Sequence, residues 1–577
     1  MKVSDYIAEY LAEKQVPAVF ELVGGMITFL VDSIHSHGKT RIVSMHHEQG
    51  AAFAAEGASR VSRIPCVAMA TSGPGATNLL TGVASCYFDS TPAVFITGQV
   101  NRSEQKGTSG VRQLGFQETD IVQMVMPIVK RVWSVDDPQE IPTILAEAFR
   151  VATTGRPGPV LIDIPMDVQR SNIEPPKRSE LCTPTLSEAR MSVADAQAVR
   201  GALLKAKRPL ILAGGGIQSA NAAEEFLQFV AMAHIPVVHS LMAVDALPSD
   251  HTMNVGMIGS YGNRWANLAI SEADMLLVLG SRLDVRQTGS DTEGFKEGRE
   301  IFHVDCEVAE MNNRVRGCHA ILSELGPAIR TLRDVLAPDS GYLSARFAAW
   351  TAQISELRNT WPDVDELQGI EGINPNLFMH QLSRATRGAS AYVVDVGQHQ
   401  MWAAQSLELQ AGQRFLTSGG MGSMGFALPA AIGAAIAQPG REVVMIAGDG
   451  SFQCNLQELQ TVARLRLPIK LVVVNNECLG MVRQFQQSYF DGRYQSTMWG
   501  YSAPDFSAVA NAYGIPSRTV SDPEMVDASV DWLSNESGPA LLQVMVSPYA
   551  NAYPKLAFGK GMSSMEPQEL SVKMEST

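Results

Sequence analysis

The chain is short of cysteine, of positive charge and of long hydrophobic runs, and each shortage argues against a class of protein. Its seven cysteines are an odd number without a Cys-x-x-Cys pair, which argues against a disulfide framework and a zinc site. Its 45 basic against 59 acidic residues leave a net charge of -14 and no basic surface for general nucleic-acid binding. No segment has the roughly 20 consecutive apolar residues that cross a bilayer, and the first residues lack a signal-peptide core. We expect a cytoplasmic protein that binds neither nucleic acid nor membrane.

Apolar residues are abundant and are arranged as in an α/β protein. With 577 residues and 45% hydrophobic letters, the chain is long enough for roughly three domains with separate cores. Strand-like patterns at 41–45, 66–71, 93–97 and 160–164 alternate with helical patterns, which predicts a largely parallel sheet. Similar Gly-rich turns at 71 and 417 indicate two related domains.

Composition also predicts the boundaries. Residues 171–192 are rich in proline, serine and charge, which is typical of a linker. A looser connection with scattered proline and glycine follows residue 340. We expect domains at 1–175, 193–340 and 372–548, followed by a tail at 549–577 that is either a lid or a disordered end.

The most informative segment is the Gly-Asp-Gly turn at 448–450, which follows a predicted strand at 443–447. Asn475-Asn476 follows a second predicted strand at 469–474, and apolar residues between the two strands recur at helical spacing. This order brings Asp449 and Asn476 to one sheet edge. Mg²⁺ prefers six oxygen ligands, so we expect these side chains and the Cys478 carbonyl to hold it and to leave positions for phosphate oxygens.

Backbone groups of the same segment are expected to bind the diphosphate. A helix predicted to start near Ser451 would direct free N–H groups toward the phosphates, and Gly448 and Gly450 would allow a close approach. A Gly-Asp-Gly triplet alone is usually an ordinary turn. The Asn-Asn pair at this distance is what favours a metal site.

The segment resembles the thiamine diphosphate (ThDP) binding motif, and over residues 3–545 the chain resembles the acetohydroxyacid (acetolactate) synthase family. The stretches that carry the resemblance, besides the metal segment, are HEQGAAFAAEG, ATSGPGATNLLTG, GFQETDI, GRPGPVLIDIP, DVGQHQMWAAQ and TSGGMGSMGFALPAAIGA. The resemblance implies three α/β domains: a pyrimidine-binding domain, a central FAD-binding-like domain and a diphosphate-binding domain. It also implies active sites between subunits of a homodimer or homotetramer.

The same resemblance assigns the residues that hold the cofactor. Glu48 would contact the aminopyrimidine ring so that the opposite amino group becomes a base; taken alone, it is more typical of a glutamate at a helix start. Gln398 and His399 would contact the diphosphate, although His399 alone could be a capping residue. Met424 and the Gly422 carbonyl would keep the cofactor bent, which brings its base beside the reactive carbon; by itself Met424 is typical of a core residue.

The implied reaction is decarboxylation of pyruvate and transfer of its two-carbon unit. The cofactor accepts the electron pair released with carbon dioxide, and the resulting enamine attacks a second carbonyl compound. Phe116 is expected to form an apolar wall, or else is a core aromatic, and Gln117 to donate to the developing oxyanion. Arg282 matches the arginine that binds the acceptor carboxylate, although it could be a surface arginine.

The central block resembles a flavin-binding domain. Gly214, Gly215 and Gly216 follow a predicted strand and form either a phosphate loop or a tight turn, because no full Gly-x-Gly-x-x-Gly is present. The stretch LGSRLDVRQTG resembles the flavin-contact segment and carries Asp284 and Arg286. The resemblance implies FAD in a structural rather than a redox role.

Several departures from the family indicate an altered acceptor pocket. Phe485 stands in place of a tryptophan, Met166 in place of a lysine, Ser260-Tyr261 in place of Met-His and Met26 in place of a small residue. The loop at 101–118 is also longer than in the synthases. We therefore predict a ThDP- and Mg²⁺-dependent carboligase whose acceptor is pyruvate, giving acetolactate, or a ketone or keto sugar.

Three alternatives differ in chemistry. A simple 2-keto acid decarboxylase would place histidines in the loop at 101–118, which has none. A pyruvate oxidase would pass electrons to FAD. An inactive regulatory homologue would usually lose the metal or glutamate position, whereas this chain keeps Glu48, Asp449 and Asn476.

Overall fold

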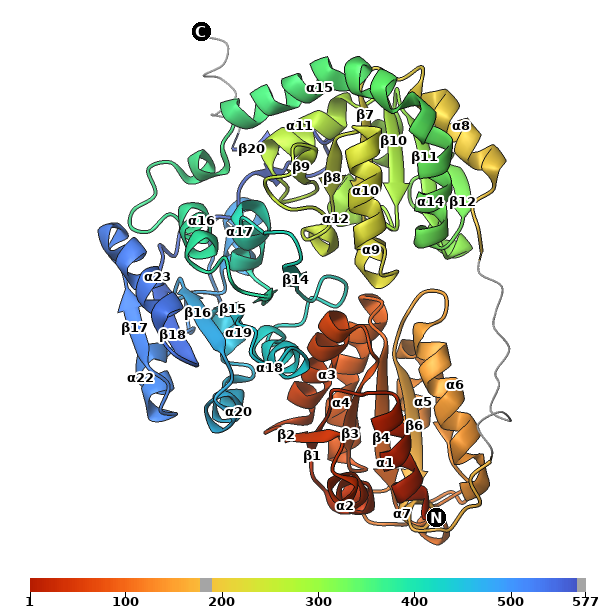
Figure 1. Cartoon of the computed structure of the whole chain (residues 1–577). Helices are drawn as coiled ribbons and strands as arrows, with labels where there is room; N and C mark the ends of the chain where they lie inside the picture. The colour runs from red at the N-terminus through yellow and green to blue at the C-terminus, as the bar shows by residue number, and fades with distance from the viewer. Residues whose placement is uncertain (177–188, 568–577) are drawn as a thin grey trace.

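The computed structural model describes residues 1–176 and 189–567, which form three α/β units (Figure 1). Each unit contains a six-stranded sheet whose strand pairs are all parallel, with helices on its faces. The predicted three-sheet α/β architecture is confirmed. Part of the predicted linker, 177–188, and the end of the tail, 568–577, lie outside the described residues. No helix of the described part is long and apolar enough to span a membrane.

The first sheet has the order β2-β1-β3-β4-β6-β5. Its strands are β1 (Ala18–Leu22), β2 (Arg41–Ser44), β3 (Cys66–Ala70), β4 (Ala93–Gln99), β5 (Arg131–Ser134) and β6 (Val160–Pro165), and its main helices are α1 (Val3–Glu13), α2 (Thr28–His37), α3 (Glu48–Ser62), α4 (Pro74–Phe88) and α6 (Ile141–Thr153). Strands β3, β4 and β6 are buried along their whole length. Helices cover both faces of the sheet, which explains why these strands are continuous apolar runs in the sequence.

The central sheet has the order β12-β11-β10-β7-β8-β9. Its strands are β7 (Pro209–Ala213), β8 (Val237–His239), β9 (Asn254–Met257), β10 (Met275–Leu279), β11 (Glu300–Asp305) and β12 (His319–Leu322), and its helices include α8 (Val193–Leu203), α10 (Ala223–Ala233), α11 (Arg264–Glu272) and α14 (Leu325–Leu336). The strand order reverses between β7 and β10. In open α/β sheets, ligands bind at the carboxyl ends of the strands beside such a reversal.

The third sheet has the order β14-β13-β15-β16-β18-β17. Its strands are β13 (Ala391–Val394), β14 (Arg414–Leu416), β15 (Val443–Gly448), β16 (Ile469–Asn475), β17 (Ser517–Val520) and β18 (Ala540–Met545), and its helices include α16 (Pro375–Ala385), α17 (Gln398–Ser406), α18 (Ala427–Ala437), α21 (Gly480–Tyr489) and α23 (Val526–Asn535). The connectivity repeats that of the first sheet. The reversal here falls between β13 and β15.

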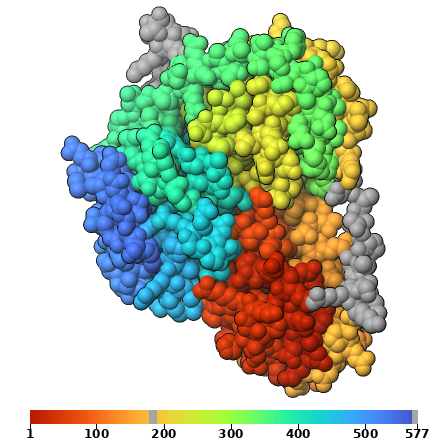
Figure 2. Space-filling view, viewed as in Figure 1, coloured from red at the N-terminus to blue at the C-terminus, as the bar shows by residue number. Residues whose placement is uncertain are grey.

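The first and third units share one hydrophobic core through α3 and α18 (Figure 1), and Figure 2 shows the two units in contact at the surface. Phe53 on α3 packs edge to face against Phe426 just before α18, with 5.5 Å between ring centroids. Gly57 allows the backbones to touch, because a Cβ there would lie 2.7 Å from the carbonyl carbon of Ala430. This packing fixes the start of α3 relative to the third sheet.

The expectation about the connection after residue 340 is wrong: it is not loose, because α15 (Ser340–Thr360) runs through it and buries Leu343 and Phe347 in the central core. A helix does begin near Ser451 as expected, but it is not continuous: the four-residue α19 (Asp449–Phe452) is followed by a 3-10 turn (Leu456–Glu458) and α20 (Leu459–Leu465). It is interrupted at Asn455, whose side chain donates to the Gly425 carbonyl at 2.8 Å.

Residues 549–567 return to the central unit (Figure 1). There β19 (Lys555–Leu556) pairs antiparallel with β20 (Met565–Glu566). Leu556 N–H donates to the Ser260 carbonyl at 2.9 Å, and Met562 packs with Leu556 in a core cluster of the central unit.

Candidate functional site

Three helices of the third unit begin at one edge of its sheet. α17 begins after β13, α19 after β15 and α21 after β16, so two of them flank the reversal of strand order. No side chain caps the start of α17 or α21. The first N–H groups of these helices therefore lack a cap, and the positive end of a helix favours an anion. This edge is a candidate site for a phosphate group.

Three oxygens converge at the same edge. The side-chain oxygen of Asn476 lies 3.1 Å from Asp449 Oδ1 and 2.8 Å from the Cys478 carbonyl oxygen. Oxygens this close repel each other unless a cation lies between them, and neighbouring ligands of an octahedral Mg²⁺ ion are about 3.0 Å apart. One carboxylate, one amide oxygen and one carbonyl therefore fit the predicted metal ion.

Tyr501 holds the second oxygen of the Asp449 carboxylate. Its hydroxyl donates to Asp449 Oδ2 at 2.8 Å and leaves Oδ1 facing Asn476. Burial raises the pKa of Asp449 to about 6, against the opposing effect of the Tyr501 hydrogen bond. Tyr501 is a site residue that the sequence analysis missed, because no motif or periodicity connects it with the Gly-Asp-Gly turn.

His399 lies beside this edge with an unpaired ring nitrogen. It is buried, and Nε2 has no hydrogen-bond partner among the described residues. Burial lowers the pKa of His399 to about 3, so the ring is neutral. A Cβ on Gly448 would lie 2.8 Å from its Nδ1, so glycine is needed there. A buried nitrogen without a partner is a group that a bound ligand can satisfy.

The loop before α18 places Met424 next to Gly450. Gly422 has φ +67°, a left-handed conformation that favours glycine. A Cβ on Gly450 would lie 3.5 Å from Met424 Cε. Asp395 fixes the loop, since its Oδ1 accepts from Gly425 N–H at 3.0 Å. The exposed Met424 side chain is thus supported beside the candidate phosphate site.

Glu48 is the first residue of α3 and is buried. Asn78 Nδ2 donates to Glu48 Oε2 at 2.9 Å, and a Cβ on Gly75 would lie 3.2 Å from Oε1. The next residue, Gln49, accepts a hydrogen bond from Asn455 of the third unit at 3.1 Å. In the described part of this single chain, no hydrogen bond or ion pair joins Glu48 to the three metal-facing residues.

Phe116 and Gln117 lie on an exposed loop of the first unit. Phe116 is 79% exposed, and Gln117 has φ +65°. A Cβ on Gly73 would lie 3.0 Å from Gln117 Cβ, so the Gly-rich turn after β3 supports this residue. The Glu118 carboxylate accepts from two backbone N–H groups of the loop at 2.6 and 2.8 Å, which holds its two sides together.

A large cavity of about 1140 Å³ lies at the carboxyl ends of β7 and β10. The predicted cofactor residues that line it are Gly215, Gly216, Arg282, Asp284 and Arg286, together with Ser260 and Tyr261. Gly214 instead lets two loops pack, because a Cβ there would lie 2.5 Å from Ser281 Cα. Phe116, Gln117 and Glu48 do not line this cavity, whereas Arg282 does.

The cavity suits a dinucleotide. It lies beside the reversal of strand order, where doubly wound sheets bind such ligands. Gln218 lines it, and its buried Oε1 has no hydrogen-bond partner in the described part of the chain. Arg282 and Asp284 form a loose ion pair of 3.7 Å on its wall. These groups fit the FAD that the sequence analysis predicted.

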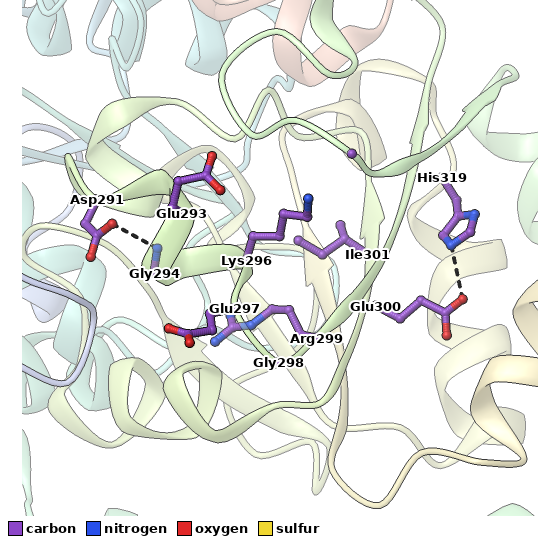
Figure 3. A pocket seen from close by; sticks show the side chains of 11 residues that line it. Asp291, Glu293, Gly294, Lys296, Glu297, Gly298, Arg299, Glu300, Ile301 and His319 are labelled. Carbon is purple, nitrogen blue, oxygen red and sulfur yellow. Dashed lines mark hydrogen bonds and ion pairs between the residues drawn. The ribbon is translucent and has the colours of Figure 1, made fainter.

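Another hollow, of about 940 Å³, lies at the opposite edge of the central sheet, where β11 and β12 begin (Figure 3). Lys296 and Arg299 line it together with several acidic side chains, and His319 Nε2 lies 3.1 Å from Glu300 Oε1. Its location at the amino ends of the strands and its mixed charge do not favour a ligand site.

Comparisons with known protein families match each of the three units. The N-terminal TPP binding domain of thiamine pyrophosphate enzymes matches residues 1–124, the central domain matches 196–332 and the C-terminal TPP binding domain matches 395–544. The chain therefore belongs to the thiamine pyrophosphate (ThDP) enzyme family.

Acetolactate synthases are among the proteins of this family that the chain is similar to. The chain is 37% identical over 568 residues to the acetolactate synthase isozyme 2 large subunit of Escherichia coli (strain K12), with 98% of this chain and 99% of that protein covered. It is 36% identical to acetolactate synthase 2, chloroplastic, of Nicotiana tabacum, with 97% and 84% covered. It is 35% identical to the acetolactate synthase large subunit of Lactococcus lactis subsp. lactis (strain IL1403), with 96% and 94% covered. The predicted resemblance to this family is confirmed.

Proposed function

We propose that the protein is a Mg²⁺-dependent carboligase that decarboxylates pyruvate and transfers the two-carbon unit to a second carbonyl compound. The observation that carries the proposal is the convergence of the Asp449, Asn476 and Cys478 oxygens beside the uncapped starts of α17 and α21. One ion and one diphosphate would satisfy both features.

In this proposal, residues of the chain bind the metal ion and the cofactor and orient them. Asp449, Asn476 and the Cys478 carbonyl would hold Mg²⁺, and His399 would satisfy its buried nitrogen on the diphosphate. ThDP, when bound, would supply a nucleophilic carbon for the keto group and a cationic ring as acceptor for the electrons released with carbon dioxide. Glu48, held by Asn78, would exchange a proton with the aminopyrimidine ring.

A second copy of the chain would complete the site. Glu48 makes no hydrogen bond or ion pair with the metal-facing residues of its own chain in the part that the structure describes. Apolar side chains in the loops that carry Met424 and Tyr501 are also exposed, among them Met421, Met424 and Trp499. Such a set is typical of a protein interface. We infer a homodimer or a homotetramer with active sites between subunits.

The acceptor we propose is pyruvate or a larger ketone, including a keto sugar. Phe485 on α21 is 52% exposed and lies 4.7 Å from Tyr489 and 5.9 Å from Phe490, measured between ring centroids. Lys555 Nζ lies 4.9 Å from the Tyr489 centroid. The exposed aromatic rings of Phe485, Tyr489 and Phe490 support an acceptor larger than a small 2-keto acid. FAD in the central cavity would have a structural role.

Product analysis tests the proposal. The protein is incubated with ThDP, Mg²⁺, FAD and pyruvate, with and without a panel of 2-keto acids and ketones, and products are separated by chiral chromatography and mass spectrometry. Acetolactate or a tertiary alcohol from a ketone is expected. Acetaldehyde alone would indicate a decarboxylase, and anaerobic bleaching of the flavin by pyruvate would indicate an oxidase.

A further inference from the structure

The amide of Asn476 can present either its oxygen or its nitrogen to the metal site, and its neighbours decide which. Asn476 Nδ2 donates to Gln398 Oε1 at 3.1 Å, so Oδ1 faces Asp449 and the Cys478 carbonyl. Turned by 180°, the amide would place its oxygen 3.1 Å from Gln398 Oε1 and its nitrogen at the metal site. An amide NH₂ is a donor and not a cation ligand. The orientation of Gln398 therefore determines whether Asn476 can bind the metal.

Gln398 is in turn oriented by Gln484 on α21. Gln398 Nε2 donates to Gln484 Oε1 at 3.0 Å. The backbone of Ala552, in the segment that follows β18, fixes Gln484: its N–H donates to Gln484 Oε1 at 2.9 Å and its carbonyl accepts from Gln484 Nε2 at 3.0 Å. Backbone groups cannot exchange the roles of donor and acceptor. The donor and acceptor of the Ala552 backbone thus fix the orientation of the Gln484 amide, which fixes that of Gln398, which fixes that of Asn476.

This row of amides has no room to rearrange. Asn476, Gln398 and Gln484 are 6%, 3% and 2% exposed, so bulk water offers them few alternative partners. Gly480 provides the space for them, because a Cβ there would lie 2.6 Å from Asn476 Nδ2 and from Gln398 Cδ.

We propose that Gln484 is a positioning residue for the metal site: its amide, oriented by the Ala552 backbone, directs the Asn476 oxygen toward Mg²⁺ through Gln398. The proposal rests on the ThDP- and magnesium-dependent function above. Residues that orient metal ligands commonly change metal affinity by about 10- to 100-fold when replaced. Mg²⁺ requires near-octahedral geometry, whereas Ca²⁺ tolerates irregular sites, so a misoriented ligand affects Mg²⁺ more.

The first test measures metal-dependent cofactor binding without substrate. Full-length protein is titrated with Mg²⁺ or Ca²⁺ in the presence of ThDP, and binding is followed by tryptophan fluorescence. Gln484→Met is expected to raise the half-saturating Mg²⁺ concentration about tenfold or more, and the Ca²⁺ value less. Gln486→Met is the matched control, since this amide bonds to Gln495 and Thr497 instead, and it is expected to behave as the unaltered protein. An equal loss for both metals would overturn the proposal.

One further variant separates polarity from packing. Gln484→Glu keeps the size of the side chain and an oxygen that accepts from Ala552 and Gln398, so its Mg²⁺ dependence is expected to change much less than the roughly tenfold loss of Gln484→Met. An equal loss in both would contradict the role of polarity. If Gln484→Met does not fold, as judged by circular dichroism, Gln484→Glu alone tests the proposal. A loss of Mg²⁺ affinity of about tenfold in Gln484→Glu would then exclude Gln484 as a residue that orients Asn476.

A double-mutant cycle tests the connection to Asn476. The side chain of Asn476→Asp has no hydrogen-bond donor, so the Gln398 amide would have to turn by 180° to donate to it. The Gln398 oxygen would then face the Gln484 Oε1 oxygen. Adding Gln484→Met removes this conflict and is expected to leave Mg²⁺ affinity unchanged or higher in that background. If Gln484→Met lowers Mg²⁺ affinity equally in the unaltered protein and in Asn476→Asp, then Gln484 does not act through Asn476 and the proposal is overturned. Absence of Mg²⁺-dependent ThDP binding in the unaltered protein would instead refute the proposed function.

Discussion

Asn78 on α4 donates a hydrogen bond of 2.9 Å to Glu48 at the start of α3, so a neighbouring helix fixes one oxygen of this buried carboxylate. Gly75 leaves space beside the other oxygen. Two contributions to activity can therefore be tested separately: the carboxylate of Glu48 and the orientation that Asn78 gives it.

Glu48→Gln is expected to abolish turnover and to leave cofactor binding nearly intact. The amide keeps the shape and the contact with Asn78 but cannot exchange a proton, and loss of acid–base catalysis costs about 10²- to 10⁴-fold in rate. Product formation from pyruvate and Mg²⁺-dependent ThDP binding are measured on the same protein. Near-normal turnover would exclude Glu48 from catalysis.

Asn78→Ala is expected to lower kcat about tenfold with little change in ThDP affinity, because a hydrogen bond to a charged group contributes about 1.5–3 kcal/mol. The matched control is Thr77→Ala, since the Thr77 hydroxyl bonds to carbonyls of its own helix start and not to Glu48. Steady-state kinetics with pyruvate distinguish the two. Equal effects of both substitutions would indicate a general disturbance of α4.

Tyr501→Phe is expected to weaken Mg²⁺ binding by about tenfold, as other losses of a hydrogen bond to a metal ligand do. It removes only the hydroxyl that holds Asp449 Oδ2. Tyr494→Phe, in the same segment, is the control, because the Tyr494 ring packs against Trp499. A Mg²⁺ titration of ThDP binding gives the result, and unchanged affinity in Tyr501→Phe would mean that Asp449 is oriented by other contacts.

The sequence predicts the strands at the site well and the side-chain contacts poorly. The patterns at 443–447 and 469–474 correspond to β15 (Val443–Gly448) and β16 (Ile469–Asn475), because buried parallel strands are continuous apolar runs. The break at Asn455 depends on a contact with Gly425, which lies far away in the sequence. Tyr501 and Gln484 likewise join the site only through the tertiary fold. Periodicity contains no information about such contacts.

The sequence does not predict the helix α15, for a related reason. Proline and glycine near its start indicate a loose connection, whereas Leu343 and Phe347 make the helix stable by packing in the central core. Tertiary burial here outweighs the local signal.

Gly57→Ala is expected to destabilise the contact between the first and third units by about 1–3 kcal/mol, as overpacking does. The new methyl group would lie 2.7 Å from the Ala430 carbonyl carbon, and backbone cannot move aside as a side chain can. Gly201→Ala in α8 is the control, because a Cβ there meets nothing within 4 Å. Alanine at an open helical position stabilises by about 0.4–1 kcal/mol. Thermal unfolding should show opposite signs for the two.

His380 on α16 lies between two carboxylates and makes stability depend on pH. Its Nε2 is 2.9 Å from Asp363 Oδ2, and its Nδ1 is 3.0 Å from Glu408 Oε1. Burial by itself would lower the pKa of His380, but the hydrogen bonds and charges of both carboxylates outweigh it and raise the pKa above 6.5. The folded protein therefore binds this proton more tightly than the unfolded chain does. The resulting stabilisation is complete below the unfolded pKa and is lost as pH rises through the folded pKa.

His380→Gln is accordingly expected to lower the Tm most below about pH 6.5 and progressively less at higher pH. Glutamine retains hydrogen-bonding capacity but cannot carry the charge that the two carboxylates stabilise. His319→Gln is the control, since the contact of His319 with Glu300 lies at the surface, where ion pairs contribute little. Melting curves of all three proteins between about pH 5.5 and 9 give the comparison. A difference between His380→Gln and the unaltered protein that stays constant over this range would show that His380 acts through packing and neutral hydrogen bonds alone.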